Sequence, residues 1–166
     1  MNIEPTFIIN AIVIGLGATL VMDAWALIMR FAFNIPSLNY CMVGRWICLM
    51  PRGDFTHSSI AEAPRMKLEC TAGWLAHYLI GAIFALMLVV LTSGSWLETP
   101  TLVPALLFGV STVLVPFLIM QPSFGLGVAA AKTPNPNQAR LRSIMAHSVF
   151  GIGLYASALS LNHFLS

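Results

Sequence analysis

Charged side chains are scarce in this chain. Asp, Glu, Lys and Arg together make up 8% of its 166 residues, whereas hydrophobic residues make up 58%. A soluble domain carries roughly 25% charged residues, so this composition cannot cover a globular surface that faces water. The apolar stretches are long and unbroken, not short and alternating, which argues against an outer-membrane barrel. The composition therefore predicts an all-α integral membrane protein that forms one domain over residues 1–166.

Motifs of the common enzyme classes are missing as well. The chain contains no His-Glu-x-x-His, no Gly-x-Ser-x-Gly and no phosphate-binding loop. It also lacks Cys-x-x-Cys-His, which excludes covalently attached haem. An enzyme with water-exposed chemistry is therefore the least favoured class, and no catalytic residue is predicted.

Basic residues are absent from the N-terminus, from the loop around Glu98 and from the C-terminal tail. All eight fall into two groups, Arg30, Arg45, Arg52, Arg65 and Lys67 in the first and Lys132, Arg140 and Arg142 in the second. Loops that carry Lys and Arg stay on the cytoplasmic side of a membrane. The distribution predicts that both groups are cytoplasmic and that both termini lie outside.

Cysteine is rare, and its three copies all lie in the first basic segment, as Cys41, Cys48 and Cys70. The cytoplasm keeps thiols reduced, so we expect three free cysteines that pack as small apolar side chains. Cys41 and Cys48 together with His57 match no zinc-binding spacing, and no metal site is predicted.

Four apolar runs are long enough to cross a bilayer. They predict transmembrane helices at about residues 7–33, 71–92, 101–121 and 143–165. The first run is too long for a cleavable signal peptide and has no basic residues before it. Pro116 and Pro122 interrupt the third run, and each is expected to free a backbone carbonyl one turn earlier, near Thr112 and Leu118.

Residues 37–50 form an apolar segment that is too short to span and contains Arg45. Ser37 can cap a helix here and Pro51 can end it. The segment predicts an amphipathic helix lying at the inner membrane surface. The residues expected at the lipid headgroups are Arg45, Trp46 and Trp74.

An Ala-His pair followed four residues later by Gly occurs twice, as His77 with Gly81 and as His147 with Gly151. Residues four apart share a helix face, and small residues on that face allow another backbone to come close. A histidine in a membrane span normally faces protein or water, so both rings are expected inside the bundle.

Each predicted span contributes one polar residue to the inner half of the membrane. These residues are Asp23, His77, Gln121 and His147. Ionisable groups inside a span mark functional sites by default, and imidazole titrates near neutral pH. We therefore expect a polar pocket for handling or transporting a small solute or ion.

Two other functions fit the same residues. In the first, His77 and His147 ligate one b-type haem between two helices, or serve a quinone redox module. In the second, the protein is an accessory or structural subunit of a membrane complex, and the histidines only bridge helices.

Distinctive short runs occur along nearly the whole chain. They are Ile35-Pro36-Ser37-Leu38-Asn39-Tyr40, Val43-Gly44-Arg45-Trp46, Pro51-Arg52-Gly53-x-Phe55-x-His57, Trp74-x-Ala76-His77-Tyr78, Met120-Gln121-Pro122 and Lys132-Thr133-Pro134. These runs resemble a family of small bacterial inner-membrane proteins, domain of unknown function 2938. The resemblance implies a four-helix protein of the bacterial cytoplasmic membrane and implies no activity. Lipid is the expected partner, a homodimer or a membrane-complex subunit is a further hypothesis, and no nucleic acid is expected.

Overall fold

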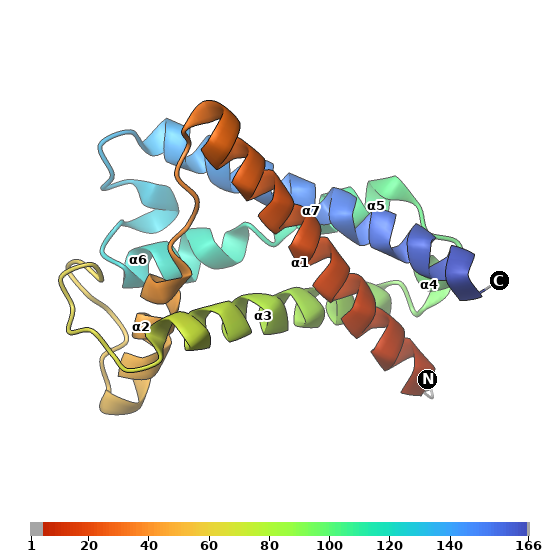
Figure 1. The fold of residues 1–166 in the computed structure, drawn as a ribbon, viewed down its shortest axis with the longest axis horizontal. Coiled ribbons are helices and arrows are strands. Elements are labelled where there is room, and N and C mark those ends of the chain that lie inside the picture. The colour runs from red at the N-terminus through yellow and green to blue at the C-terminus, as the bar shows by residue number, and fades with distance from the viewer. Residues whose placement is uncertain (1–4, 166) are drawn as a thin grey trace. The chain divides into compact units, whose positions relative to one another are not determined.

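The computed structural model describes residues 5–165, and every regular element in that range is helical (Figure 1). The elements are α1 (Pro5–Phe33), α2 (Tyr40–Leu49), η1 (Met50–Arg52), α3 (Glu69–Leu91), α4 (Ser95–Glu98), α5 (Leu102–Ser111), η2 (Pro116–Met120), α6 (Gln121–Ser123), η3 (Val128–Ala130) and α7 (Pro136–Leu165).

Four helical segments are long and apolar enough to span a membrane. They are Thr6–Phe33, Glu69–Leu91, Leu102–Ser123 and Pro136–Phe164. Many of their large apolar side chains lie on the outside, such as Leu107 at 67% exposure. The prediction of an all-α chain with four potential spans is confirmed, because each of the four apolar runs coincides with one of these segments.

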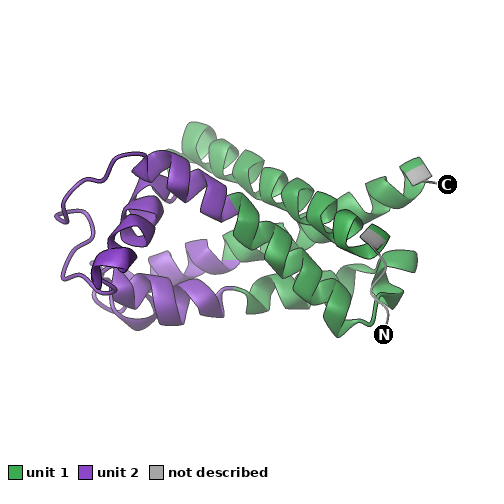
Figure 2. Ribbon diagram, turned by 90° about the horizontal axis from the view of Figure 1, so that it is seen from below, with its two compact units in different colours: residues 1–37, 78–112, 145–166 green, residues 38–77, 113–144 purple. Residues whose placement is uncertain are grey.

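The chain forms two compact units, which Figure 2 shows in green and purple. Unit 1 contains residues 1–37, 78–112 and 145–166, and unit 2 contains residues 38–77 and 113–144. Each unit has its own cluster of buried apolar side chains. The expectation of one transmembrane domain stays a prediction.

Small residues bring the helices of unit 1 together. A Cβ added to Gly15 on α1 would lie 2.6 Å from the Cα of Ala82 on α3, and one added to Gly153 on α7 would lie 2.9 Å from the Cα of Ala18. A Cβ on Gly109 of α5 would meet the backbone of Gly151 on α7. Such close backbone approach is what small residues permit between apolar helices. The close packing predicted for the Gly81 and Gly151 faces is confirmed, since Gly81 likewise lies against Thr19.

The core of unit 1 lies where these helices cross. Ile14 and Leu154 are among its fully buried side chains, and Phe84 packs edge-on against Phe108 and at 67° to Phe150. Close-packed aliphatic and aromatic side chains gain dispersion energy from the many atomic contacts that each of them makes.

Unit 2 contains α2, which packs on the first turns of α3. A Cβ on Gly44 would meet the backbone of Glu69, and one on Gly73 would meet the carbonyl of Tyr40. Asn39 caps α2, because its side chain accepts a hydrogen bond from the N–H of Cys41 at 3.0 Å. The predicted cap was Ser37, two residues earlier.

The third potential span is interrupted as its prolines predict. α5 ends at Ser111 and is followed by a short turn. The element η2, which begins at Pro116, is a π-helix. Proline has no N–H to donate, so the ordinary helical pattern cannot continue through it. Single-turn π-segments often occur at functional sites.

The fourth potential span begins earlier than predicted. α7 starts at Pro136, whereas the apolar pattern placed its start near residue 143. Proline suits the first turn of a helix, and the N–H of Ala139 bonds the carbonyl of Asn135 at 3.1 Å. The polar first two turns of α7 therefore extend beyond the apolar run.

Candidate functional site

A carboxylate and a phenol link α1 to α3 within unit 1. The hydroxyl of Tyr78 donates to Oδ2 of Asp23 at 2.9 Å, and both side chains are half-buried. A carboxylate that leaves water needs hydrogen bonds or a counter-charge to remain ionised. The Tyr78 hydroxyl supplies one such bond across the helix pair.

A threonine and a histidine link α5 to α7 in the same unit. The hydroxyl oxygen of Thr112 lies 2.7 Å from Nδ1 of His147, and it also donates to the carbonyl of Gly109 at 2.6 Å. A hydroxyl has one proton to give. Because the Thr112 hydroxyl directs its proton to the Gly109 carbonyl, its oxygen accepts from His147, which donates through Nδ1–H. The lone pair of the neutral ring then lies on Nε2.

These four side chains lie at similar offsets from the close helix contacts of unit 1, counted along each helix. On each helix, the polar residue lies about one turn from a residue that makes a close contact with a neighbouring helix. The contact residue and the polar residue are Ala18 and Asp23 on α1, Gly81 and Tyr78 on α3, Gly109 and Thr112 at α5, and Gly151 and His147 on α7. The contacts show that α1 runs opposite to α3 and α7, and α5 runs opposite to α7. All four polar residues are therefore displaced from the close contacts in the same direction. The displacement along each helix is about 5–8 Å at a rise of 1.5 Å per residue. We call Asp23, Tyr78, Thr112 and His147 the polar layer.

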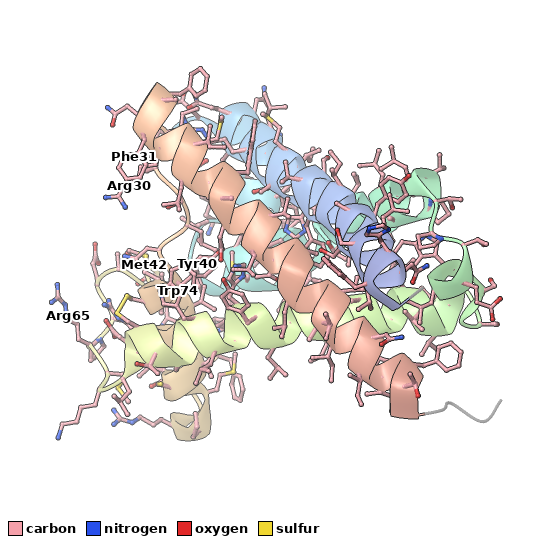
Figure 3. The ribbon with its side chains drawn as sticks, turned by 45° about the vertical axis from the view of Figure 1, so that its right-hand side comes forward. Arg30, Phe31, Tyr40, Met42, Arg65 and Trp74 are labelled. Carbon is pink, nitrogen blue, oxygen red and sulfur yellow. A yellow bond between two sulfur atoms is a disulfide. The ribbon has the colours of Figure 1, made fainter. Side chains whose placement is uncertain are left out.

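The ring of His77 belongs to unit 2, where it stacks on Tyr40 from α2. The ring centroids are 4.1 Å apart and the planes meet at 26°. Trp74 lies one turn earlier on α3, with its centroid 4.6 Å from that of Tyr40 (Figure 3). Trp74 is 46% exposed, so one side of this aromatic group remains on the surface.

Gln121 also belongs to unit 2 and directly follows the π-helix. It is only 6% exposed, and its Nε2 lies 3.5 Å from the hydroxyl of Ser143. Its buried Oε1 has no hydrogen-bond partner among residues 5–165, and the same holds for the buried Nε2 of His57. A buried acceptor without a partner costs free energy unless water or a ligand satisfies it.

Two of the predicted pocket residues, Asp23 and His147, thus lie in unit 1, and two, His77 and Gln121, lie in unit 2. The four-residue pocket and the bis-histidine haem site both stay predictions. The sequence does not indicate Tyr78 or Thr112 as site residues. A tyrosine near the end of an apolar run is ordinary in a membrane helix, and Thr112 is predicted only to have a freed carbonyl.

Arg45 does not occupy the position predicted for it. Its guanidinium was expected at lipid headgroups, but the residue is 6% exposed and forms a buried ion pair with Glu69. Its Nη1 also donates to the carbonyls of Ile60, Ala61 and Ala63 at 3.1–3.3 Å. The hydrogen bonds that Arg45 donates to the Glu69 carboxylate raise the pKa of Arg45 above its ordinary value. Arg45 therefore ties the long loop and α3 to α2, while the headgroup contacts of Trp46 and Trp74 stay predictions.

The cysteines also differ from the prediction of three free thiols. Cys41 and Cys70 form a disulfide with a Cα–Cα distance of 3.9 Å, and Cys48 remains free. The packing of α2 on α3 brings together two residues that are 29 positions apart. Within the described residues, no three His, Cys, Asp or Glu side chains are grouped so as to hold a metal ion.

Comparison with known proteins gives one match. A family model described as "Protein of unknown function (DUF2938)" matches residues 12–161, and the predicted resemblance is confirmed. No curated protein and no solved structure matches the chain.

Proposed function

The chain belongs to the DUF2938 family of proteins of unknown function, and on the geometry of its own residues we propose that it carries a small solute or ion across a membrane, with Asp23 as the protonatable group. The observation that carries the proposal is the hydrogen bond from Tyr78 to Asp23 between two apolar helices. Ionisable residues within spans are costly and mark ion pathways and proton relays.

The polar layer supports this proposal because it couples protonation to helix contacts. While Asp23 is ionised, it accepts from Tyr78 and links α1 to α3. Protonation removes the charge that strengthens this bond. His147 holds the corresponding link from α7 to α5 through Thr112. Protonation of Asp23 thus loosens the α1–α3 pair, whereas protonation of His147 at Nε2 strengthens the bond that its Nδ1–H donates to Thr112. Helix contacts that change with protonation are one means of alternating access.

The interrupted third span supplies a second supporting feature. Irregular backbone at membrane depth is tolerated where it is buried in protein or lines a cavity, and discontinuous helices form the sites of many transporters. Here the π-helix at Pro116 leads directly to Gln121, whose buried Oε1 lacks a partner among the described side chains and backbone. We propose that Gln121 and His77 contribute to solute binding.

We further propose that the protein resides in the bacterial cytoplasmic membrane with both termini in the periplasm. The basis is the grouping of all eight Lys and Arg residues in two segments, which the positive-inside rule places in the cytoplasm. A C-terminal alkaline phosphatase fusion should be active and a C-terminal green fluorescent protein fusion dark. The reverse result would contradict this orientation.

The transport proposal is tested with purified protein in vesicles that enclose a pH-sensitive dye. A potassium diffusion potential is applied while amino acids, sugars and inorganic cations are added outside one at a time. We expect at least one solute to drive proton movement with the unaltered protein, and Asp23→Asn to reduce it to the level of protein-free vesicles. Asp54→Asn is the matched control, because it makes the same chemical change at an exposed loop position outside the apolar helices.

A flux that persists unchanged in Asp23→Asn would contradict the proposal. Absence of flux with every solute would also count against it and would favour the accessory-subunit hypothesis.

A further inference from the structure

A disulfide joins the first turns of α2 and α3. The two half-cystines are Cys41, which is half-buried, and Cys70, which is exposed on the surface of the chain. A sulfur on an exposed residue is easier for a thiolate to reach than one on a half-buried residue, and access is one of the factors that set the rate of thiol–disulfide exchange. Cys70 is therefore the sulfur at which exchange would begin.

The disulfide lies in the first of the two basic segments of the sequence. Five of the eight basic residues of the chain lie between positions 30 and 67, just before Cys70. The positive-inside rule assigns such a segment to the cytoplasm, where glutathione and thioredoxin keep structural cysteines reduced. A disulfide that forms on that side is typically transient and serves catalysis or redox sensing.

The disulfide also lies next to the contacts that hold α2 in place. Cys70 follows Glu69, the partner of Arg45 in the buried ion pair. Cys41 follows Tyr40, whose ring stacks on His77 at 4.1 Å. Opening the bond would leave α2 held against α3 only by noncovalent contacts and by the connecting chain, and the loop of 29 positions between the two cysteines would regain conformational freedom.

We propose that Cys41 and Cys70 form a reversible thiol–disulfide exchange site, opened by a cytoplasmic dithiol of the thioredoxin class, and that its opening releases α2 from α3. The inference does not depend on the proposed transport function, because it concerns only residues of unit 2 and is tested without a transported solute.

The exchange is balanced in electrons and protons. One thiolate of the dithiol attacks Sγ of Cys70, the Cys41–Cys70 bond breaks, and Cys41 leaves as a thiolate that takes a proton from water. The second thiol of the reductant loses its proton and displaces Cys70 from the mixed disulfide. In total the disulfide gains two electrons and two protons, and the dithiol becomes a disulfide.

The first experiment uses the full-length protein in lipid nanodiscs, with Cys48→Ser as the background so that only the two proposed thiols remain. The protein is equilibrated with ratios of reduced to oxidised dithiothreitol and then alkylated with a maleimide that shifts its mass. We expect both thiols to appear together in one two-electron transition, and to disappear together when the oxidised form is restored. If Cys48→Ser does not fold, the unaltered chain with a third, constant thiol signal gives the same transition.

The structural consequence is measured by hydrogen exchange on the same samples. Amides of Tyr40–Leu49 should exchange about tenfold faster or more after reduction, whereas those of Leu102–Ser111 in unit 1 should not change. Equal exchange of α2 in both redox states would overturn the release of α2.

A final experiment separates a cytoplasmic switch from a permanent bond in an oxidising compartment. Cells that express the Cys48→Ser chain are treated with the thiol oxidant diamide, acid-quenched and alkylated at intervals. We expect the thiols to be reduced before the pulse, oxidised after it and reduced again on recovery. A bond that stays oxidised throughout, or thiols that never pair, would overturn the proposal.

Discussion

Arg45 and Glu69 meet through two parallel hydrogen bonds, from Nε to Oε2 at 2.9 Å and from Nη2 to Oε1 at 2.8 Å. This paired geometry is the strongest that a guanidinium and a carboxylate can form. Oε2 of Glu69 also accepts from the backbone N–H of Met66 at 2.9 Å. The pair therefore fixes the start of α3, the loop before it and α2 with a single set of polar contacts.

Removing one member of this pair should destabilise the protein strongly. Glu69→Gln or Arg45→Met leaves the other charge buried without its partner, and we expect each to lower the free energy of unfolding by roughly 3 kcal/mol. The measurement is urea-induced unfolding in detergent micelles. Arg52→Met, at an exposed position, is the control and should change stability by less than about 0.5 kcal/mol. A double variant, Arg45→Met with Glu69→Gln, should lose less than the sum of the two single losses, and strict additivity would contradict direct coupling.

This pair also shows what the sequence could not predict. The four potential spans depend on local apolar runs, and the break in the third depends on two prolines, so both features can be read along the chain. Arg45 and Glu69 are 24 positions apart, and no periodicity relates them. An arginine in a short apolar segment predicts a headgroup anchor, because the sequence does not show that folding brings the Glu69 carboxylate of α3 next to it. The Cys41–Cys70 bond depends on the same crossing and was missed for the same reason.

The candidate site, like the fold, could be predicted from the sequence only in part. Apolar surroundings alone single out Asp23 and His147 as polar residues that need partners. Their partners, Tyr78 and Thr112, are ordinary residues of apolar helices, and only the antiparallel packing of those helices identifies them.

The contact between Gly109 and Gly151 predicts a steric effect in unit 1. Gly109→Ala places a Cβ 2.6 Å from the backbone nitrogen of Gly151, so α5 and α7 must separate. Overpacking typically costs about 1–3 kcal/mol, which outweighs the gain of about 1 kcal/mol in helix propensity. Gly109→Leu should be worse. Thermal unfolding provides the measurement, and Leu107→Ala, at an exposed position on the same helix, should have little effect. Unaltered stability of Gly109→Leu would show that the two backbones are not in contact.

The hydrogen bond between Tyr78 and Asp23 predicts a graded effect on transport. Tyr78→Phe keeps the ring but removes the donor, and hydrogen bonds to charged groups contribute about 1.5 kcal/mol or more. We expect about a tenfold slower proton flux than in the unaltered protein, a smaller loss than in Asp23→Asn. Tyr155→Phe, on a half-buried tyrosine of α7, is the control. If Tyr78→Phe carries protons at the full rate, the phenol has no part in the function of Asp23.

The hydroxyl of Thr112 predicts the tautomer of His147. Because that hydroxyl donates to the carbonyl of Gly109, it can only accept from the imidazole, and the neutral ring should carry its proton on Nδ1. Free imidazole side chains favour the Nε2–H form, so ¹⁵N chemical shifts of histidine-labelled protein in nanodiscs distinguish the two, with His147→Asn identifying the signal. Thr112→Val keeps the shape but removes the acceptor. It should return His147 toward the Nε2–H form and cost about 1–3 kcal/mol of stability, whereas Thr112→Ser should preserve both properties. Thr92→Val is the control, because Thr92 bonds carbonyls of its own helix. An unchanged His147 signal in Thr112→Val would show that another group sets the tautomer, and the α5–α7 link in the polar layer would have to be abandoned.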